Sequence, residues 1–137
     1  MNFSLSEFIY SDSAKALGID NMPKAVSVFD NLLLLIVNVL QPLRDAYGKP
    51  LYVNSGFRCE RLNKAVGGAA NSQHLYGQAA DITTGTKAGN KALMLLAQRL
   101  NLPFDQLINE KPDTNGNPSW VHISYTKTPR RQVMIVK

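Results

Sequence analysis

Apolar residues in the first third of the chain recur at helical spacing. Ser4, with Glu7 three residues later, is typical of a helix start, and we expect this first helix to end near Gly18. Further on, spacings of three and four predict an amphipathic helix with a buried face made by Val26, Phe29, Leu33, Ile36, Leu40 and Leu43. Pro42 should kink or break that helix, and Gly48 should end it.

Short apolar and alternating segments dominate the rest of the chain. They predict five strands, over residues 51–55, 79–83, 104–108, 120–125 and 131–136. Two helices are expected between them, near 60–65 and over 90–100, the second with one face made by Ala92, Leu93, Leu96 and Leu100. The pair Asn115-Gly116 is typical of a hairpin. Helices early and strands late indicate an α+β fold, in which an antiparallel sheet is flanked by helices.

Composition narrows the class of protein. The 137 residues point to a single domain, with residues 1–48 mainly helical and 49–137 bearing the sheet. With 45% hydrophobic and 18% charged residues, the chain is not a disordered polymer. The lone cysteine, Cys59, excludes an intrachain disulfide. The apolar stretch over residues 32–40 is shorter than the ~20 residues that cross a bilayer, so we expect no transmembrane segment.

The net charge of +5 is concentrated near the C-terminus. Residues 123–137 contain four cations and no acid, namely Lys127, Arg130, Arg131 and Lys137, which leaves +1 for the rest of the chain. No basic and aromatic interleaving accompanies this run, so we expect no nucleic-acid partner. We interpret the run as a solvated last strand that would favour an anionic surface.

The two histidines of the chain have distinctive surroundings. His74 lies in a loop that leads into a predicted strand, Asp81 follows it by seven residues, and His122 lies in a later strand. A lone histidine is more often a packed side chain than a metal ligand. A carboxylate between Ala80 and Ile82, however, should be paired or metal-bound. Two imidazoles and one carboxylate would bind one Zn²⁺ and leave a fourth position open, as in a catalytic site.

The surrounding motifs resemble a known family. Ser72-x-His74-x-x-Gly77-x-Ala79-x-Asp81, followed by Trp120-Val121-His122, is similar to the signature of the zinc D-Ala-D-Ala carboxypeptidases, peptidoglycan peptidases that include phage endolysins. The resemblance extends to Gln41-Pro42-Leu43-Arg44, Ser55-Gly56-Phe57-Arg58, Gly67-Gly68 and Phe104-Asp105-Gln106-Leu107-Ile108. It implies the fold that this family shares with hedgehog signalling domains. Residues 1–137 would then form one zinc peptidase domain.

The resemblance also implies roles for individual residues. His74, Asp81 and His122 would be the ligands of one catalytic zinc ion. The substrate would be bound by Arg58, Ser72, Gln73 and Trp120. The guanidinium of Arg58 suits a carboxylate, although a structural ion pair is the alternative. For Ser72 the alternative is a loop hydrogen bond, and for Trp120 it is a place in the core.

One position departs from the family pattern. Several members carry a glutamate three residues before the last histidine, where this chain has Ser119. A hydroxyl is a poor general base. The acids nearby are Glu110 and Asp113, which are the candidate catalytic bases, and either would otherwise be a solvated surface acid. We favour Glu110.

The sequence therefore predicts a zinc metallopeptidase that hydrolyses peptidoglycan stem peptides or cross-links, as a D-Ala-D-Ala carboxypeptidase or as an endolysin-type endopeptidase. The alternative is a non-catalytic domain, or a phage structural domain of the same fold, that binds cell-wall peptide. Catalysis by a Cys59 thiolate is disfavoured because no further histidine is free to act as its base. We expect a monomer that is made in the cytoplasm without a signal peptide and acts on the cell wall after release.

Overall fold

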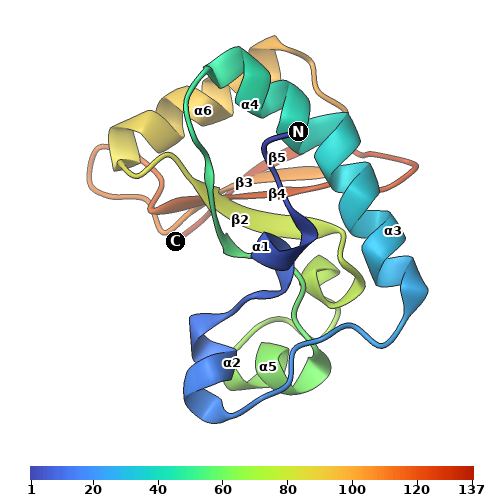
Figure 1. Cartoon of the computed structure of the whole chain (residues 1–137). Helices are drawn as coiled ribbons and strands as arrows, with labels where there is room; N and C mark the ends of the chain where they lie inside the picture. Colours follow the sequence, from blue (N-terminus) through green and yellow to red (C-terminus); the bar gives the residue numbers. More distant parts are fainter.

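The computed structural model describes all 137 residues, as helices packed around a five-stranded sheet (Figure 1). The helices are α1 (Leu5–Ile9), α2 (Asp12–Leu17), α3 (Val26–Leu35), α4 (Gln41–Tyr47), α5 (Glu60–Ala65) and α6 (Lys87–Arg99), with a π-helical turn at Ile36–Leu40 and a 3₁₀ turn at Gln73–Tyr76. The strands are β1 (Tyr52–Ser55), β2 (Ala79–Thr83), β3 (Gln106–Glu110), β4 (Trp120–Ser124) and β5 (Gln132–Val136). This arrangement confirms the expected α+β class.

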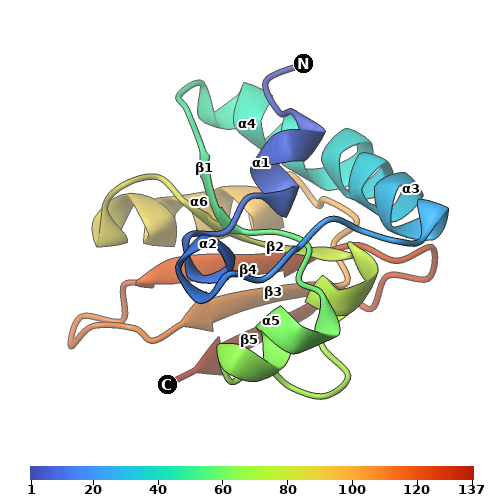
Figure 2. The ribbon, with the colours of Figure 1, turned by 60° about the horizontal axis from the view of Figure 1, so that its bottom comes forward.

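The strands lie in the order β1-β2-β4-β3-β5, which Figure 2 shows from top to bottom. Three of the neighbouring pairs are antiparallel, but β5 runs parallel to β3, so the expectation of a wholly antiparallel sheet is wrong in this respect. Both edges of β4 are occupied, by β2 and β3, and β5 therefore pairs with the open edge of β3. A strand that reverses direction after β4 runs antiparallel to β4 and hence parallel to β3.

The two faces of the sheet have different chemistry because side chains alternate along each strand. One face is apolar and joins the core, through Ala80, Ile82, Leu107, Val121 and Ile123. Helix α6 packs against β3 and β4 on this side, and α4 packs against α6 (Figure 1). Residues on the opposite face alternate with these core positions and include Asp81 and His122. The core side therefore supports the sheet while the polar side remains available for chemistry.

Helix α3, the π-helical turn and α4 form one continuous helical stretch whose buried face differs from the expected one. Its buried residues are Val28, Leu32, Leu35, Ile36, Val39, Leu40 and Leu43, whereas Val26 and Leu33 are exposed. The expected face is right from residue 36 onward, at Ile36, Leu40 and Leu43. In the π-helical turn the Gln41 amide bonds to the Ile36 carbonyl, five residues back. This wider turn contains one extra residue and shifts the apolar register by one position.

The same turn explains why Pro42 does not break the helix. Pro42 lies in the first turn of α4, where its missing N–H is tolerated. The whole stretch, Val26–Tyr47, covers 22 residues and contains an 18-residue window with a mean hydropathy of 1.7, so it is long and apolar enough to cross a membrane. The core helix of a globular domain passes the same test, and here the buried side of the stretch packs into the core.

Smaller differences concern element boundaries. The first expected helix is divided into α1 and α2, with Ser11 accepting a hydrogen bond from the amide of Ala14, although the stop at Gly18 is confirmed. Strand β3 begins two residues later than expected. In α6 the buried residues are Asn90, Leu93, Met94 and Ala97, so Ala92 and Leu100 of the expected face are exposed.

Candidate metal centre and active-site cleft

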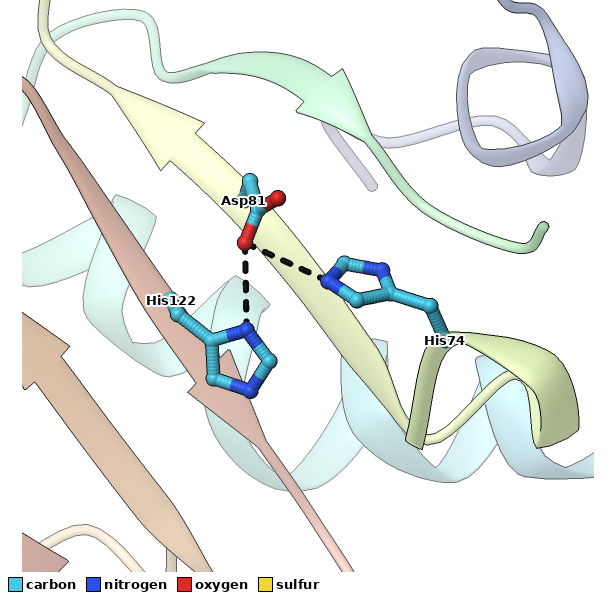
Figure 3. Close-up of side chains that lie close together, drawn as sticks. All are labelled: His74, Asp81 and His122. Carbon is cyan, nitrogen blue, oxygen red and sulfur yellow. Dashed lines mark hydrogen bonds and ion pairs between the residues drawn. The ribbon is translucent and has the colours of Figure 1, made fainter. Parts of the chain in front are cut away.

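Three elements bring together the residues expected to bind a metal. His74 lies in the 3₁₀ turn, Asp81 is on β2 and His122 is on β4, and their side chains point toward one another in Figure 3. Asp81 and His122 are direct cross-strand partners, so both project from the same face of the sheet. The turn places His74 over this pair.

The geometry fits a metal ion. The Asp81 Oδ1 atom lies 3.3 Å from His74 Nε2 and 3.1 Å from His122 Nδ1, and the three donor atoms lie within 4.8 Å of one another. Two ligands at zinc-bond length in a tetrahedral site are about 3.4 Å apart, close to both distances. The set has two nitrogens and one oxygen, which is a zinc donor set. His74 is buried and only 13% of the Asp81 side chain is exposed, so the site is sheltered but reachable.

A backbone contact fixes the orientation of the His74 ring. Its Nδ1 atom lies 2.6 Å from the Gly56 carbonyl oxygen. Because a carbonyl only accepts, Nδ1 must carry a proton, and Nε2 is the nitrogen that faces Asp81 and would bind a metal. Such an outer hydrogen bond commonly sets the tautomer of a metal-binding histidine. Gly56 is required here, since a Cβ at this position would lie 2.5 Å from the Phe8 carbonyl oxygen.

Gly77 ends the turn that carries His74. Its φ of +73° is in the left-handed region, and an added Cβ would lie 2.6 Å from the Val28 carbonyl oxygen. The turn begins at Ser72, whose hydroxyl accepts a hydrogen bond from the His74 amide at 3.2 Å. The 3₁₀ turn is therefore held at both ends, and it lies directly against α3.

The two histidines control the charge of Asp81. Burial alone would favour the neutral acid, but the adjacent His74 and His122 hold the pKa of the Asp81 carboxyl well below its usual range. The carboxyl is therefore ionised at neutral pH, as a metal ligand must be.

A cleft of about 660 Å³ opens onto this centre, and all three metal-ligand candidates line it. Other polar side chains in its wall include Arg58, Gln73, Gln106, Glu110, Lys111 and Arg130. The sheet contributes through its polar face. The loop after α5 and the segments around β3 and β5 form the remaining walls. This volume is in the range of small-molecule and peptide sites.

The two acids expected as candidate bases occupy different places. Glu110 lines the cleft, two positions along β3 from Ile108, the cross-strand partner of His122. Residues in this diagonal relation share a face and lie about 7–8 Å apart. Burial, and then the negative charge of Asp81, raise the pKa of the Glu110 carboxyl. Asp113 does not line this cleft; its Oδ1 atom accepts from the amides of Asn115 and Asn117, each at 2.9 Å.

Ser119, at the position where the family resemblance leads us to expect a glutamate, is also absent from the cleft wall. Its hydroxyl donates to the Lys111 carbonyl at 2.7 Å, and its amide donates to the Glu110 carbonyl at 3.0 Å. The residue thus closes the base of the loop between β3 and β4.

The residues expected to bind substrate all line the cleft. Arg58 is close to Ser72, with Nη2 to Oγ at 3.5 Å, and its Nε atom is buried without a hydrogen-bond partner. Burial lowers the pKa of the Arg58 guanidinium, which the charges of Asp81 and Glu110 partly offset. Trp120 projects on the same side of β4 as His122, and the Lys111 ammonium lies 5.6 Å from the centre of its ring.

Sequence reasoning missed the ion pair between Asp105 and Arg130. Only 2% of the Asp105 side chain is exposed, and its Oδ2 atom accepts from Arg130 Nη2 at 2.7 Å. Hydrogen bonds from Arg130 lower the pKa of the Asp105 carboxyl to about 2. A signal was present, because Asp105 follows Phe104 in an apolar segment and a buried carboxylate needs a partner. What the sequence does not provide is the location of that partner, 25 residues away.

Comparison with known proteins adds an independent line of information. A sequence profile of the family described as Peptidase M15 matches residues 1–124. The zinc D-Ala-D-Ala carboxypeptidase of Streptomyces albus G is 40% identical to this chain over 87 residues. The aligned segment covers 62% of this chain and 32% of that protein, so the similarity concerns about a third of the relative's length.

Proposed function

The chain belongs to the peptidase M15 family, and from this premise we propose that it is a zinc peptidase that hydrolyses the peptide stems or cross-links of peptidoglycan. The observation that carries the proposal is the convergence of His74, Asp81 and His122 in a cleft that also contains Glu110 and Arg58. The name of the Streptomyces relative supports both the metal and the D-Ala-D-Ala peptide as substrate.

In this proposal the three converging side chains hold one zinc ion. A zinc ion in such a site acts as a Lewis acid and lowers the pKa of a water molecule. Three protein ligands leave a position for substrate or water, which distinguishes a catalytic from a structural site. The hydrogen bond from His74 Nδ1 to Gly56 keeps the ring in position while substrate enters.

Glu110 is the residue we propose as general base. It removes a proton from the attacking water and then passes it to the leaving amine. A carboxyl with a raised pKa suits both steps, since it accepts a proton more readily than an ordinary glutamate and still releases it. The position of Glu110 on β3 removes the need for a glutamate at Ser119, whose hydroxyl is engaged by the loop backbone.

Arg58 is the residue we propose as substrate anchor. Its Nε atom is a buried donor without a partner, which is costly unless a ligand supplies an acceptor. A carboxylate or a carbonyl oxygen of a peptide fits this requirement. The same group would stabilise negative charge that develops on the scissile carbonyl.

The test compares Glu110→Gln with Asp113→Asn, each a carboxyl-to-amide change. Zinc content would be measured by atomic spectroscopy, and turnover with a peptide ending in D-Ala-D-Ala and with cross-linked wall fragments. We expect Glu110→Gln to retain zinc and to lose about 10²- to 10⁴-fold in kcat, as for a general base. Asp113→Asn should retain both the zinc and the turnover of the parent.

The products identify the bond that is cleaved. Released D-alanine indicates a carboxypeptidase, and separated cross-linked fragments indicate an endopeptidase. Zinc binding and peptide binding without any product would instead support the alternative, a domain that holds cell-wall peptide. Full activity of Glu110→Gln would contradict the assignment of the base but not that of the metal ligands.

A further inference from the structure

The segment after residue 124, which lies beyond the matched family profile, contributes to the cleft. It contains Arg130 and strand β5, which pairs with β3 from Gln106↔Gln132 to Glu110↔Val136. Both Arg130 and Val136 line the cleft. The basic end of the chain is thus more than a solvated tail, because part of it forms one wall of the site.

Arg130 acts on the cleft through Asp105. The Asp105 carboxylate accepts four hydrogen bonds, three of them from Arg130: its amide and Nε each lie 3.0 Å from Oδ1, and its Nη2 lies 2.7 Å from Oδ2. The fourth comes from Gln73 Nε2, at 2.9 Å from Oδ2. The backbone of this segment is tied down as well, since the Gln132 amide donates to the Asp105 carbonyl at 2.9 Å.

This contact determines the orientation of the Gln73 side-chain amide. An ionised carboxylate can only accept, so Gln73 must turn its NH₂ group toward Asp105. The Gln73 Oε1 atom is then left buried and without a partner, on a residue that lines the cleft and precedes His74. The reversed amide would place two oxygens against each other, so the ion pair fixes the orientation.

A second residue of the cleft wall has a buried atom without a hydrogen-bond partner, and this atom is complementary to Gln73 Oε1. Arg58 Nε is a buried donor and Gln73 Oε1 a buried acceptor, and both residues line the same cavity. A peptide group carries one acceptor and one donor, its C=O and its N–H. An extended peptide substrate would supply both missing partners.

We propose that Gln73 Oε1 accepts a hydrogen bond from a backbone N–H of the substrate, and that Arg130, acting through Asp105, holds it in that orientation. The inference rests on the proposed peptide substrate and adds a specificity device to it. Gln73 contacts substrate, whereas Asp105 and Arg130 are positioning residues. The ion pair makes the site selective for amides over esters at one position of the peptide.

The decisive variant is Asp105→Asn. The new amide can donate to Gln73 Oε1, which allows the Gln73 side chain to reverse and to present its NH₂ group to the cleft. Binding would be measured by isothermal titration calorimetry on the zinc-loaded Glu110→Gln protein, so that no hydrolysis occurs. The probe is diacetyl-L-lysyl-D-alanyl-D-alanine, with analogues in which one amide N–H at a time is replaced by an ester oxygen.

We expect the peptide Kd to rise about tenfold in Asp105→Asn, as for loss of one hydrogen bond in a buried site. The parent should bind one ester analogue about tenfold less tightly than the peptide, whereas Asp105→Asn should bind that analogue and the peptide equally tightly. Gln73→Leu should raise the Kd for the peptide to a similar degree. The double variant should bind like Gln73→Leu alone, because both changes remove the same contact.

Two controls separate this role from a merely structural one. Zinc affinity and melting temperature identify variants that no longer fold. In the metal-free protein, the Gln73 side-chain NH₂ resonances should move in Asp105→Asn but not in Asp113→Asn. Equal Kd values for the parent and Asp105→Asn, or additive effects in the double variant, would overturn this inference but leave the proposed peptide substrate unaffected. If no peptide binds at all, the proposed substrate and the acceptor role of Gln73 both fail.

Discussion

Gly77 ends the turn that carries His74 of the candidate metal centre. Its replacement by alanine would lower stability through two physical effects. The first effect is backbone strain, because φ is +73°. The second is steric, because the new Cβ would lie 2.6 Å from the Val28 carbonyl oxygen, 3.0 Å from Val28 Cγ1 and 3.2 Å from Leu32 Cγ. The Val28 carbonyl and the side chains of Val28 and Leu32 belong to α3, which is packed in the core and has little room to move.

The magnitudes of these effects differ enough to be measured. A left-handed backbone costs an alanine about 1–2 kcal/mol, and overpacking a filled core adds about 1–3 kcal/mol. Gly77→Ala should therefore lower the free energy of unfolding by about 2–5 kcal/mol. Gly48→Ala is the matched control, because Gly48 has a φ of +77° but no atom within 4 Å of an added Cβ. Gly48→Ala should therefore lower the free energy of unfolding only by the cost of the left-handed backbone, about 1–2 kcal/mol.

The assay is urea unfolding of the metal-free proteins, followed by circular dichroism and by the fluorescence of the single tryptophan, Trp120. Zinc affinity should fall in Gly77→Ala, since the turn moves His74, and should be unchanged in Gly48→Ala. Equal losses of stability in the two variants would refute the argument that α3 blocks the position.

Three further predictions test other parts of the structure. Val39→Ala should lower the free energy of unfolding by about 2 kcal/mol, whereas exposed Val37→Ala should change it by less than about 0.5 kcal/mol; the reverse order in urea unfolding would refute the shifted helix register. The lowered pKa of Asp105 should contribute about 2 kcal/mol above pH 4, which is lost as pH falls toward 2. This part of the pH dependence should be absent from urea unfolding of Asp105→Asn. Ser119→Ala should lower the free energy of unfolding by about 1 kcal/mol without affecting turnover, since its hydroxyl bonds to Lys111; a large loss of kcat would show that it acts in the cleft.

The metal-ligand candidates could be predicted from the sequence because each depends on a local pattern in a turn or a strand. His74 and Asp81 are separated by seven residues, and the alternation of β4 determines which side His122 faces. The choice between Glu110 and Asp113 depended on where β3 ends, and a shift of two residues in that boundary brings Glu110 into the strand and onto the side of the sheet that faces the cleft.

Other features depended on contacts that no local pattern encodes. The π-helical turn changes the helix register by one residue, and the apolar run over residues 32–40 fits either register. The parallel pairing of β5 follows from which strand edge remains open, which is a property of the assembled sheet. The partner of Asp105 is separated from it by 25 residues and lies in a segment that looks, by composition, like a solvated tail.

The edge position of β5 has a consequence for solubility. Its residues 132–136 contain no charge, and Val133 and Ile135 are 47% and 63% exposed, features that favour edge-to-edge aggregation. Arg131 and Lys137 flank this uncharged run. If two copies met edge to edge in antiparallel register, Arg131 of one would lie opposite Lys137 of the other, and the like charges would repel. These two cations would therefore oppose self-association through this edge, and high salt, which screens their charges, would weaken that effect.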